Sequence, residues 1–338
     1  MPALTDSWKL GDLDVPNRVL LAPLAGIGNW FVRLQASRHG AGMAYSEMVS
    51  SFAIHYGNEK THLELLRVHP DEHAGGPVAL QLFGQDPDVM RSAAAHVAEN
   101  VPGVDVIDLN MGCPVPKVCK TGAGAALISD PDTAIAVARA AGEGSGLPVT
   151  VKLRSGQRQG DTSGYDLAHR LVDEAGVAAI TFHPRSAAVQ HRGVPDYDLA
   201  AKLVASLGAP VILTGGLSSP AAVQRAYEHT GAEAVMLARG SLGNPWMFEQ
   251  VLGTRAADAR PTTDEVLDEL DWVMDRGVEH LGASRAGRYL RKFYPWYVDQ
   301  LQLAPESAKR THIALQQTDS VEQARAVLAP LRGVAVAV

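Results

Sequence analysis

The chain has 338 residues, of which 46% are hydrophobic and 20% charged, and its formal net charge is −7. This composition excludes disordered and fibrous classes, and the length suits one large globular domain with a smaller second one. Two cysteines exclude a disulfide framework, and residues 1–14 carry no apolar signal segment. Because no apolar run reaches membrane-spanning length either, we expect a cytoplasmic protein with no membrane association.

Short apolar segments recur along the first three quarters of the chain and are typical of strands buried on both faces. They span residues 19–24, 43–48, 77–83, 105–110, 148–153, 178–183, 209–214 and 233–238. Longer segments with helical spacing lie between them, for example 86–100 and 218–230. This alternation predicts an α/β fold, a parallel (β/α)8 TIM barrel. The alternative is a doubly wound open sheet, but the glycine-rich stretch 122–127 follows a polar loop and lacks the third glycine of a dinucleotide fingerprint.

The carboxyl ends of these predicted strands carry a varied set of side chains. They are Pro23, Glu47, Gln81, Asn110, Lys152, His183, Thr214 and Arg239. Any one polar residue at a strand end can simply face water, whereas a complete and varied set favours the catalytic rim of a barrel.

Two glycine-containing stretches follow the last two predicted strands, at 214–219 and 238–246. Glycine permits close backbone approach, and the loops after strands seven and eight are the usual phosphate site of this fold. The alternative interpretation is a pair of tight turns.

The pattern changes after the eighth strand. We expect the barrel to occupy residues 1–252, a linker 253–263, and a small all-α helical bundle 264–338. Thr262 and Glu265 have the spacing of a capping box, and Ser320 with Gln323 can cap a later helix.

The segment 284–301 is predicted to be one helix that is ended or kinked at Pro295. It contains a cluster of cations with no acid between them in the sequence, namely Arg285, Arg288, Arg291 and Lys292. The cluster is either a local basic patch for nucleic acid, hidden by the negative net charge, or a solvated helix face.

Both cysteines lie in DLNMGCPVPKVCKTGAGAAL, residues 108–127. This stretch resembles the signature of the tRNA-dihydrouridine synthases, in particular their bacterial branch. The matching residues are Asn110, Gly112, Cys113, Pro114, Lys117, Val118, Gly122, Gly124 and Leu127. Further matches follow in family order at 17–27, 46–51, 78–84, 149–156, 182–186, 238–246 and 288–297. The resemblance runs from about residue 8 to about residue 300.

The resemblance implies an FMN-dependent barrel with a helical tRNA-binding domain, which reduces the C5=C6 bond of uridines in tRNA and is reloaded by NADPH. By similarity, the flavin would be lined by Pro23, Leu24, Ala25, Gln81, Lys152, His183, Thr214, Gly215, Gly216, Ala238 and Arg239. Cys113 would be the acid, and Asn110 and Arg185 would contact the substrate. The tRNA backbone would be bound by the cation cluster of Arg285, Arg288, Arg291 and Lys292.

The expected chemistry suits these residue types. Hydride addition at C6 of uracil leaves an enolate that must be protonated at C5, and a thiol with a pKa of about 8.5 is a suitable acid. Cys113 could instead be a small buried hydrophobe, but a lysine-bearing loop with Pro114 and Pro116 is a poor place for one. Cys119 is expected to be structural, and the spacing of the two cysteines predicts no metal site.

The chain departs from the family pattern in places. The family usually has asparagine at Thr214, glycine at Pro184 and Ala238, and Thr-Asp at Gly28 and Asn29, which puts details of the flavin contacts in question. The alternatives are an FMN barrel that reduces a small molecule, of the dihydroorotate or enoate type, or a non-catalytic RNA-binding relative. The sequence does not indicate which uridine is reduced; a monomer is expected.

Overall fold

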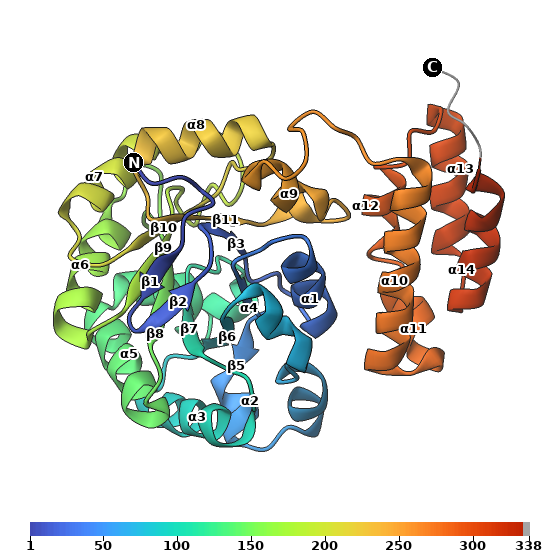
Figure 1. Ribbon diagram of the computed structural model, residues 1–338. Helices are drawn as coiled ribbons and strands as arrows, with labels where there is room; N and C mark the ends of the chain where they lie inside the picture. Colours follow the sequence, from blue (N-terminus) through green and yellow to red (C-terminus); the bar gives the residue numbers. More distant parts are fainter. Residues whose placement is uncertain (334–338) are drawn as a thin grey trace. The chain divides into compact units, whose positions relative to one another are not determined.

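The computed structural model describes residues 1–333 and divides into two compact units, Met1–Ala238 and Arg239–Val338 (Figure 1). The sequence placed the end of the barrel later, at residue 252. Residues 334–338, the end of the predicted helical domain, lie outside the described residues.

Eight parallel strands of the first unit form a closed ring. In spatial order they are β4 (Met43–Tyr45), β3 (Val19–Leu21), β11 (Ala234–Leu237), β10 (Val211–Thr214), β9 (Ala179–His183), β8 (Val149–Arg154), β7 (Val106–Met111) and β6 (Val78–Phe83). A parallel pairing of β4 with β6 closes the ring, and a short extra strand, β5 (Val49–Ser50), also pairs with β6. Each strand of the ring overlaps its predicted segment, so the predicted (β/α)8 barrel is confirmed.

Helices cover the outside of the ring, with α3, α5, α6, α7 and α8 arranged around the strands (Figure 1). The helices of this unit are α1 (Trp30–Arg38), α2 (Ser51–His55), α3 (Pro87–Asn100), α4 (Pro116–Cys119), α5 (Pro131–Ser145), α6 (Ser163–Ala175), α7 (Tyr197–Ser206) and α8 (Pro220–Thr230), with short turns η1 (Thr61–Leu65), η2 (Pro70–Gly75) and η3 (Gly124–Ser129). Several begin at a capping residue followed by proline. Asp86, Asp130 and Ser219 each accept a hydrogen bond from a backbone N–H in the first turn. Proline fits the next position because its missing N–H would have had no helical partner there.

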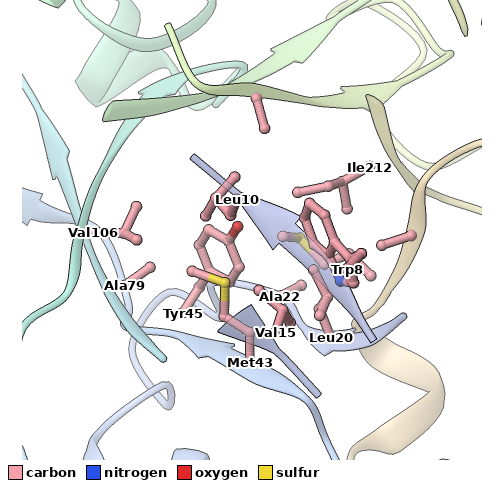
Figure 2. Packing of buried hydrophobic residues seen from close by; sticks show 13 residues of the cluster. Trp8, Leu10, Val15, Leu20, Ala22, Met43, Tyr45, Ala79, Val106 and Ile212 are labelled. Carbon is pink, nitrogen blue, oxygen red and sulfur yellow. The ribbon is translucent and has the colours of Figure 1, made fainter. Parts of the chain in front are cut away.

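An antiparallel hairpin, which the sequence analysis did not predict, closes the amino-terminal end of the barrel. It consists of β1 (Trp8–Leu10) and β2 (Leu13–Val15). Figure 2 shows Trp8 and Leu10 among inward-pointing side chains of the barrel strands, and together with Val15 they form one apolar cluster. The cluster also contains Leu20, Ala22, Met43, Tyr45, Ala79, Val106, Ala179, Ile212, Ala234 and Met236. This end of the barrel is therefore filled, which leaves the opposite end for a site.

The second unit is helical. Its elements are η4 (Arg239–Ser241), α9 (Trp246–Leu252), α10 (Thr263–Leu281), α11 (Ala283–Leu290), α12 (Tyr294–Val298), α13 (Pro305–Gln316), α14 (Val321–Leu328) and η5 (Ala329–Leu331). The capping box of Thr262 and Glu265 and the cap at Ser320 are both present. Figure 1 shows α10, α11, α13 and α14 side by side.

The segment 284–301 is broken near Pro295, as predicted, but the break lies before the proline rather than at it. The helix α11 ends at Leu290, and α12 begins only at Tyr294, with Pro295 in its first turn. A proline ring clashes with the carbonyl four residues earlier and offers no N–H, so a helix entering from 284 cannot run through Pro295. Among the described helices, none has both the length and the apolar character that a membrane crossing requires.

Candidate active site

The barrel interior is polar at the carboxyl ends of its strands, in contrast to its apolar amino-terminal end. Side chains two apart on a strand share a face, so β7 directs Asp108 and Asn110 inward, and β8 directs Thr150 and Lys152 inward. The register pairs Gln81 with Asp108 and Asn110 with Lys152 across neighbouring strands. Three strand-end residues identified from the sequence, Gln81, Asn110 and Lys152, thus face one another, together with Asp108 and Thr150, which sequence analysis missed.

The cysteine loop is anchored at the end of β7. Asn110 Oδ1 accepts hydrogen bonds from the backbone N–H of Gly112 (3.2 Å) and of Cys113 (2.9 Å). The carbonyl of Cys113 in turn accepts from Ala125 N (3.0 Å) and from the Cys119 thiol (3.2 Å). The loop holds Cys113 half-buried at the barrel mouth, while Cys119 bonds within the loop.

The charge state of Cys113 follows from its surroundings. Burial raises the pKa of the thiol above its usual value, and Arg154 and Lys152 oppose part of that rise. The group is therefore a protonated thiol at neutral pH, with two cations close enough to stabilise a thiolate once its proton has left.

Lys152 presents a cation to the barrel mouth. Burial, and next the charge of Arg154, lower its pKa to about 8, while Asp108 and Cys113 act in the opposite direction. Its ammonium makes no hydrogen bond or ion pair with any residue in the described range 1–333. An unpaired, desolvated cation at this position favours a ligand with an anionic or electron-rich edge.

Arg154 is a site residue that the sequence analysis did not single out. Its guanidinium donates to the carbonyls of Gly112 (2.9 Å), Ser186 (3.1 Å) and Gln190 (2.7 Å). It thereby ties the cysteine loop to the loop after β9. Its position at the end of a buried strand, two residues after Lys152, was the signal available in the sequence.

His183 is the last residue of β9, and Arg185 lies two residues after it. Burial, then Lys152 and Arg154, lower the pKa of His183, so its imidazole is neutral. Arg185 Nη1 lies 3.3 Å from His183 Nε2, and Arg185 Nη2 donates to the Gly193 carbonyl at 2.6 Å. The His191 ring stacks on His183 with centroids 6.0 Å apart. A neutral imidazole held in this way can hydrogen-bond a ligand without adding charge.

The turn after β10 consists of two glycines, so its backbone is not covered by side chains of its own. Gly215 and Gly216 adopt φ of 100° and 79°, and a Cβ on Gly215 would lie 2.3 Å from the His183 ring. A Cβ on Gly216 would lie 2.4 Å from the Tyr197 hydroxyl, which donates to the Gly215 carbonyl at 3.0 Å. Only glycine fits both positions. Thr214 turns its hydroxyl to the Met236 carbonyl (2.9 Å).

The loop after β3 contains Pro23, Leu24 and Ala25, and Ala25 is exposed. The Leu24 carbonyl accepts from Gly28 N at 2.7 Å. A Cβ on Gly28 would lie 2.9 Å from Glu47 N, so this position, where the chain departs from the family pattern, leaves no room for a side chain. Asn29 caps α1 by accepting from Val32 N.

The remaining predicted residues belong to the end of the barrel sequence and to the helical unit. Ala238 follows β11, and Arg239 opens the second unit.

In the helical unit, the cation cluster is partly paired through tertiary structure. Asp319, between α13 and α14, lies 3.4 Å from Arg288 Nε and 2.8 Å from Arg291 Nη2. Lys292 Nζ lies 3.9 Å from the centroid of the Tyr289 ring, and Arg285 is exposed. Asp319 therefore pairs with two of the four cations of the cluster. In neither unit do three or more His, Cys, Asp and Glu side chains of the described chain gather in a way that could hold a metal.

Comparison with known proteins bears on this arrangement. A family model described as "Dihydrouridine synthase (Dus)" matches residues 20–331. The chain belongs to the dihydrouridine synthase family. Within the family, it is 32% identical over 320 residues to tRNA-dihydrouridine synthase B of Pseudomonas aeruginosa, covering 92% of each chain. It is 33% identical over 305 residues to tRNA-dihydrouridine synthase B of Vibrio vulnificus, covering 88% of this chain and 91% of the relative.

Solved structures show the same fold at lower identity. A morphinone reductase mutant in complex with tetrahydroNAD matches with a TM-score of 0.57 and 17% identity, over 75% of this chain and 92% of that one. A variant of NCR from Zymomonas mobilis matches with a TM-score of 0.55 and 18% identity, over 77% and 94%. These similarities support the barrel assignment for the dihydrouridine synthase chain.

Proposed function

We propose that the protein is a tRNA-dihydrouridine synthase that holds FMN at the barrel mouth, is reduced by NADPH, and reduces the C5=C6 bond of uridines in tRNA. The observation that carries the proposal is the Cys113 thiol, kept protonated by burial at the same mouth as the unpaired Lys152 ammonium. The named relatives act on tRNA, and the family membership supports the same substrate class here.

The residues present fit a flavin mononucleotide. The phosphate would bind to the backbone of the Gly215–Gly216 turn and to the backbone after β11 at Ala238. Lys152 would face the electron-rich edge of the ring. Gln81 keeps an amide hydrogen for a ligand after donating to Asp108, and Pro23, Leu24 and Ala25 would line the near side. The chemistry that FMN supplies when bound is hydride transfer, here to C6 of a uracil ring.

The protein's own part is to complete that reduction with a proton. Cys113 would give its proton to C5 of the uracil, so that one hydride and one proton add across the double bond. The thiolate left behind would be stabilised by Lys152 and Arg154 until solvent returns a proton. A neutral His183 would hydrogen-bond the ring system without repelling either cation. Uracil inside folded tRNA must be extruded to reach such a site, which requires contacts to the tRNA backbone elsewhere on the protein.

The first test separates the two half-reactions in a stopped-flow experiment. Cys113→Ala should leave reduction of the flavin by NADPH nearly unchanged and slow its reoxidation by tRNA by about 10²–10⁴-fold, the usual range for loss of a general acid. Cys119→Ala is the matched control and should have little effect. Equal effects of the two substitutions would contradict the role of Cys113, and a flavin that tRNA never reoxidises would favour a small-molecule reductase.

The second test concerns the identity and site of the flavin. The purified protein should release FMN on heating, because the barrel offers one phosphate site; release of FAD would overturn this. Gly215→Ala should weaken FMN binding at least about tenfold, since its Cβ would collide with His183. Gly231→Ala is the control: Gly231 has φ of 65°, yet its Cβ would lie 3.9 Å from Val204. It also places an alanine at a positive φ, without a collision, and should keep the flavin.

A further inference from the structure

A buried carboxyl lies below the cysteine loop. Asp108 is 0% exposed, and both of its oxygens accept short hydrogen bonds. Thr150 Oγ1 donates to Oδ1 at 2.6 Å, and Gln81 Nε2 donates to Oδ2 at 2.6 Å. The proposed chemistry does not use this group, which raises the question of why the barrel carries the cost of burying it.

The hydrogen bond to Asp108 decides how the Gln81 amide is turned. Its nitrogen must face the carboxyl, so its oxygen faces the other way and accepts from Asn110 Nδ2 at 2.9 Å. Asn110 then has its own oxygen turned to the loop, where it accepts from Gly112 N and Cys113 N. Its nitrogen also contacts the Met48 sulfur at 3.6 Å. Both the oxygen and the nitrogen of the Asn110 amide are therefore hydrogen-bonded within the protein.

The opposite arrangement is unfavourable at every link. A flipped Gln81 would place its oxygen against a carboxyl oxygen and its NH₂ group against the NH₂ group of Asn110. Asn110 would have to flip in response and would then face the backbone N–H of Cys113 with a donor. One acceptor at Asp108 thus fixes the orientation of two amides in series, and the amides fix the loop.

We propose that Asp108 is a positioning residue which, through Gln81 and Asn110, holds the backbone of Cys113 in place at the barrel mouth. The catalytic consequence rests on the proposed function, because only there is Cys113 the acid; the positioning itself does not. Below, the term amide chain means the hydrogen-bonded series that runs from the Asp108 carboxyl through the amides of Gln81 and Asn110.

The amide chain needs an acceptor at position 108 rather than a charge. Burial raises the pKa of Asp108 to about 7, so both protonation states are populated near neutral pH. In the neutral acid, Oδ1 can donate to Thr150, whose hydroxyl turns to accept, while Oδ2 still accepts from Gln81. An asparagine can do the same, with its nitrogen toward Thr150. Leucine has a similar size and cannot accept at all.

Hydrogen exchange measured by mass spectrometry on the purified protein tests the positioning directly. In Asp108→Leu, peptides containing the Gly112 and Cys113 amides should exchange about 5–10-fold faster than in the wild type, because those amides lose a fixed acceptor. Asp108→Asn should restore the wild-type rate. Thr181→Val is the matched control, since it removes an inward hydroxyl of β9 that has no hydrogen-bond partner in the described chain. It should leave these peptides unchanged.

Kinetics provide the second readout. Asp108→Leu should slow reoxidation of the flavin by tRNA about 10–100-fold and leave its reduction by NADPH within about threefold, with Asp108→Asn near wild type in both. If Asp108→Leu does not fold, Gln81→Met breaks the amide chain at its middle and should give the same faster exchange.

The proposal would be overturned if the Cys113 amide exchanged at the wild-type rate in folded Asp108→Leu or Gln81→Met. It would also be overturned if Asp108→Asn exchanged as fast as Asp108→Leu. Absence of tRNA reduction by the wild type would instead count against the proposed function, and the exchange result would still decide the positioning.

Discussion

At the scale of single residues, the site gathers ionisable groups whose pKa values are shifted by burial. Burial lowers the pKa of Lys152 and His183 and raises that of Cys113 and Asp108. Perturbed groups gather at the carboxyl end of the barrel, as expected where ligand contacts compensate for lost hydration. The buried cation of Lys152, which suits the chemistry, therefore also destabilises the ligand-free fold at neutral pH.

A first prediction follows for Lys152. Its folded-state pKa is about 8, below the value of 10.5 for a free side chain. The unfolded chain thus binds more protons between these values, and the contribution of Lys152 to the free energy of unfolding rises as pH increases from about 8 to 10.5. At pH 7, Lys152→Met should stabilise the FMN-free protein by about 1–3 kcal/mol, and this gain should shrink towards pH 10.5.

Urea unfolding of the two proteins at pH 7 and pH 10 measures this difference. Lys9→Met, at a lysine side chain that is 60% exposed, is the control and should change little at either pH. A Lys152→Met variant that is less stable than the wild type at pH 7 would show that the ammonium is solvated or paired, contrary to the structure.

At the scale of elements, the helical unit shows how a break in one helix arranges charges. Arg291 and Lys292 lie between the end of α11 at Leu290 and the start of α12 at Tyr294, so the four cations do not all belong to one helix. Arg288 and Arg291 instead share Asp319, which the connection between α13 and α14 brings to them. Exposed pairs of this kind stabilise the fold by at most about 1 kcal/mol, so they do not by themselves account for the cluster.

The prediction at this scale is an effect on tRNA binding. If the cation cluster contacts phosphates, each contact adds roughly −0.9 to the slope of log affinity against log salt for a duplex, or about −0.7 for a single strand. Arg288→Ala combined with Lys292→Ala should weaken tRNA binding and make the slope shallower by about one to two units. Binding titrations across salt concentrations measure it, and flavin content should not change.

Lys9→Ala combined with Arg170→Ala removes the same charge from the barrel unit, where both cations pair with acids, and serves as the control. A cluster variant that keeps the wild-type slope would mean that the cations only solvate the helix surface. Loss of NADPH oxidation with a small acceptor would mean that they are structural.

At the scale of the barrel as a whole, stability and chemistry occupy opposite ends. The hairpin of β1 and β2 fills the amino-terminal end with Trp8, Leu10 and Val15 (Figure 2). The polar side chains described above face the other end. This separation allows a packed apolar core below a set of destabilising polar groups, the usual division of labour in this fold.

The last prediction tests that separation. Trp8 is 5% exposed and its indole donates to the Asn17 carbonyl at 3.0 Å, so Trp8→Ala should cost about 3–5 kcal/mol of unfolding free energy. Below the unfolding transition, FMN content and the rate of flavin reduction should stay within about twofold of the wild type. Urea midpoints and flavin absorbance measure the two effects. Lys9→Ala, on the same hairpin, should cost less than about 0.5 kcal/mol; a flavin lost from folded Trp8→Ala would contradict the separation.

The sequence by itself determined the parts of this protein that depend on neighbouring residues. Strand segments such as 148–153, the capping box at Thr262 and the rim residues Asn110, Lys152 and His183 all follow from periodicity and from chemistry within a few positions. Tertiary structure alone decided the contacts between distant positions: Gln81 with Asp108, Arg154 with the Gly112 carbonyl, and Arg288 with Asp319. It also decided the closing hairpin, whose three-residue strands are too short for a pattern. The physical reason is that barrel closure and strand register choose these partners, and neither is encoded within any one segment.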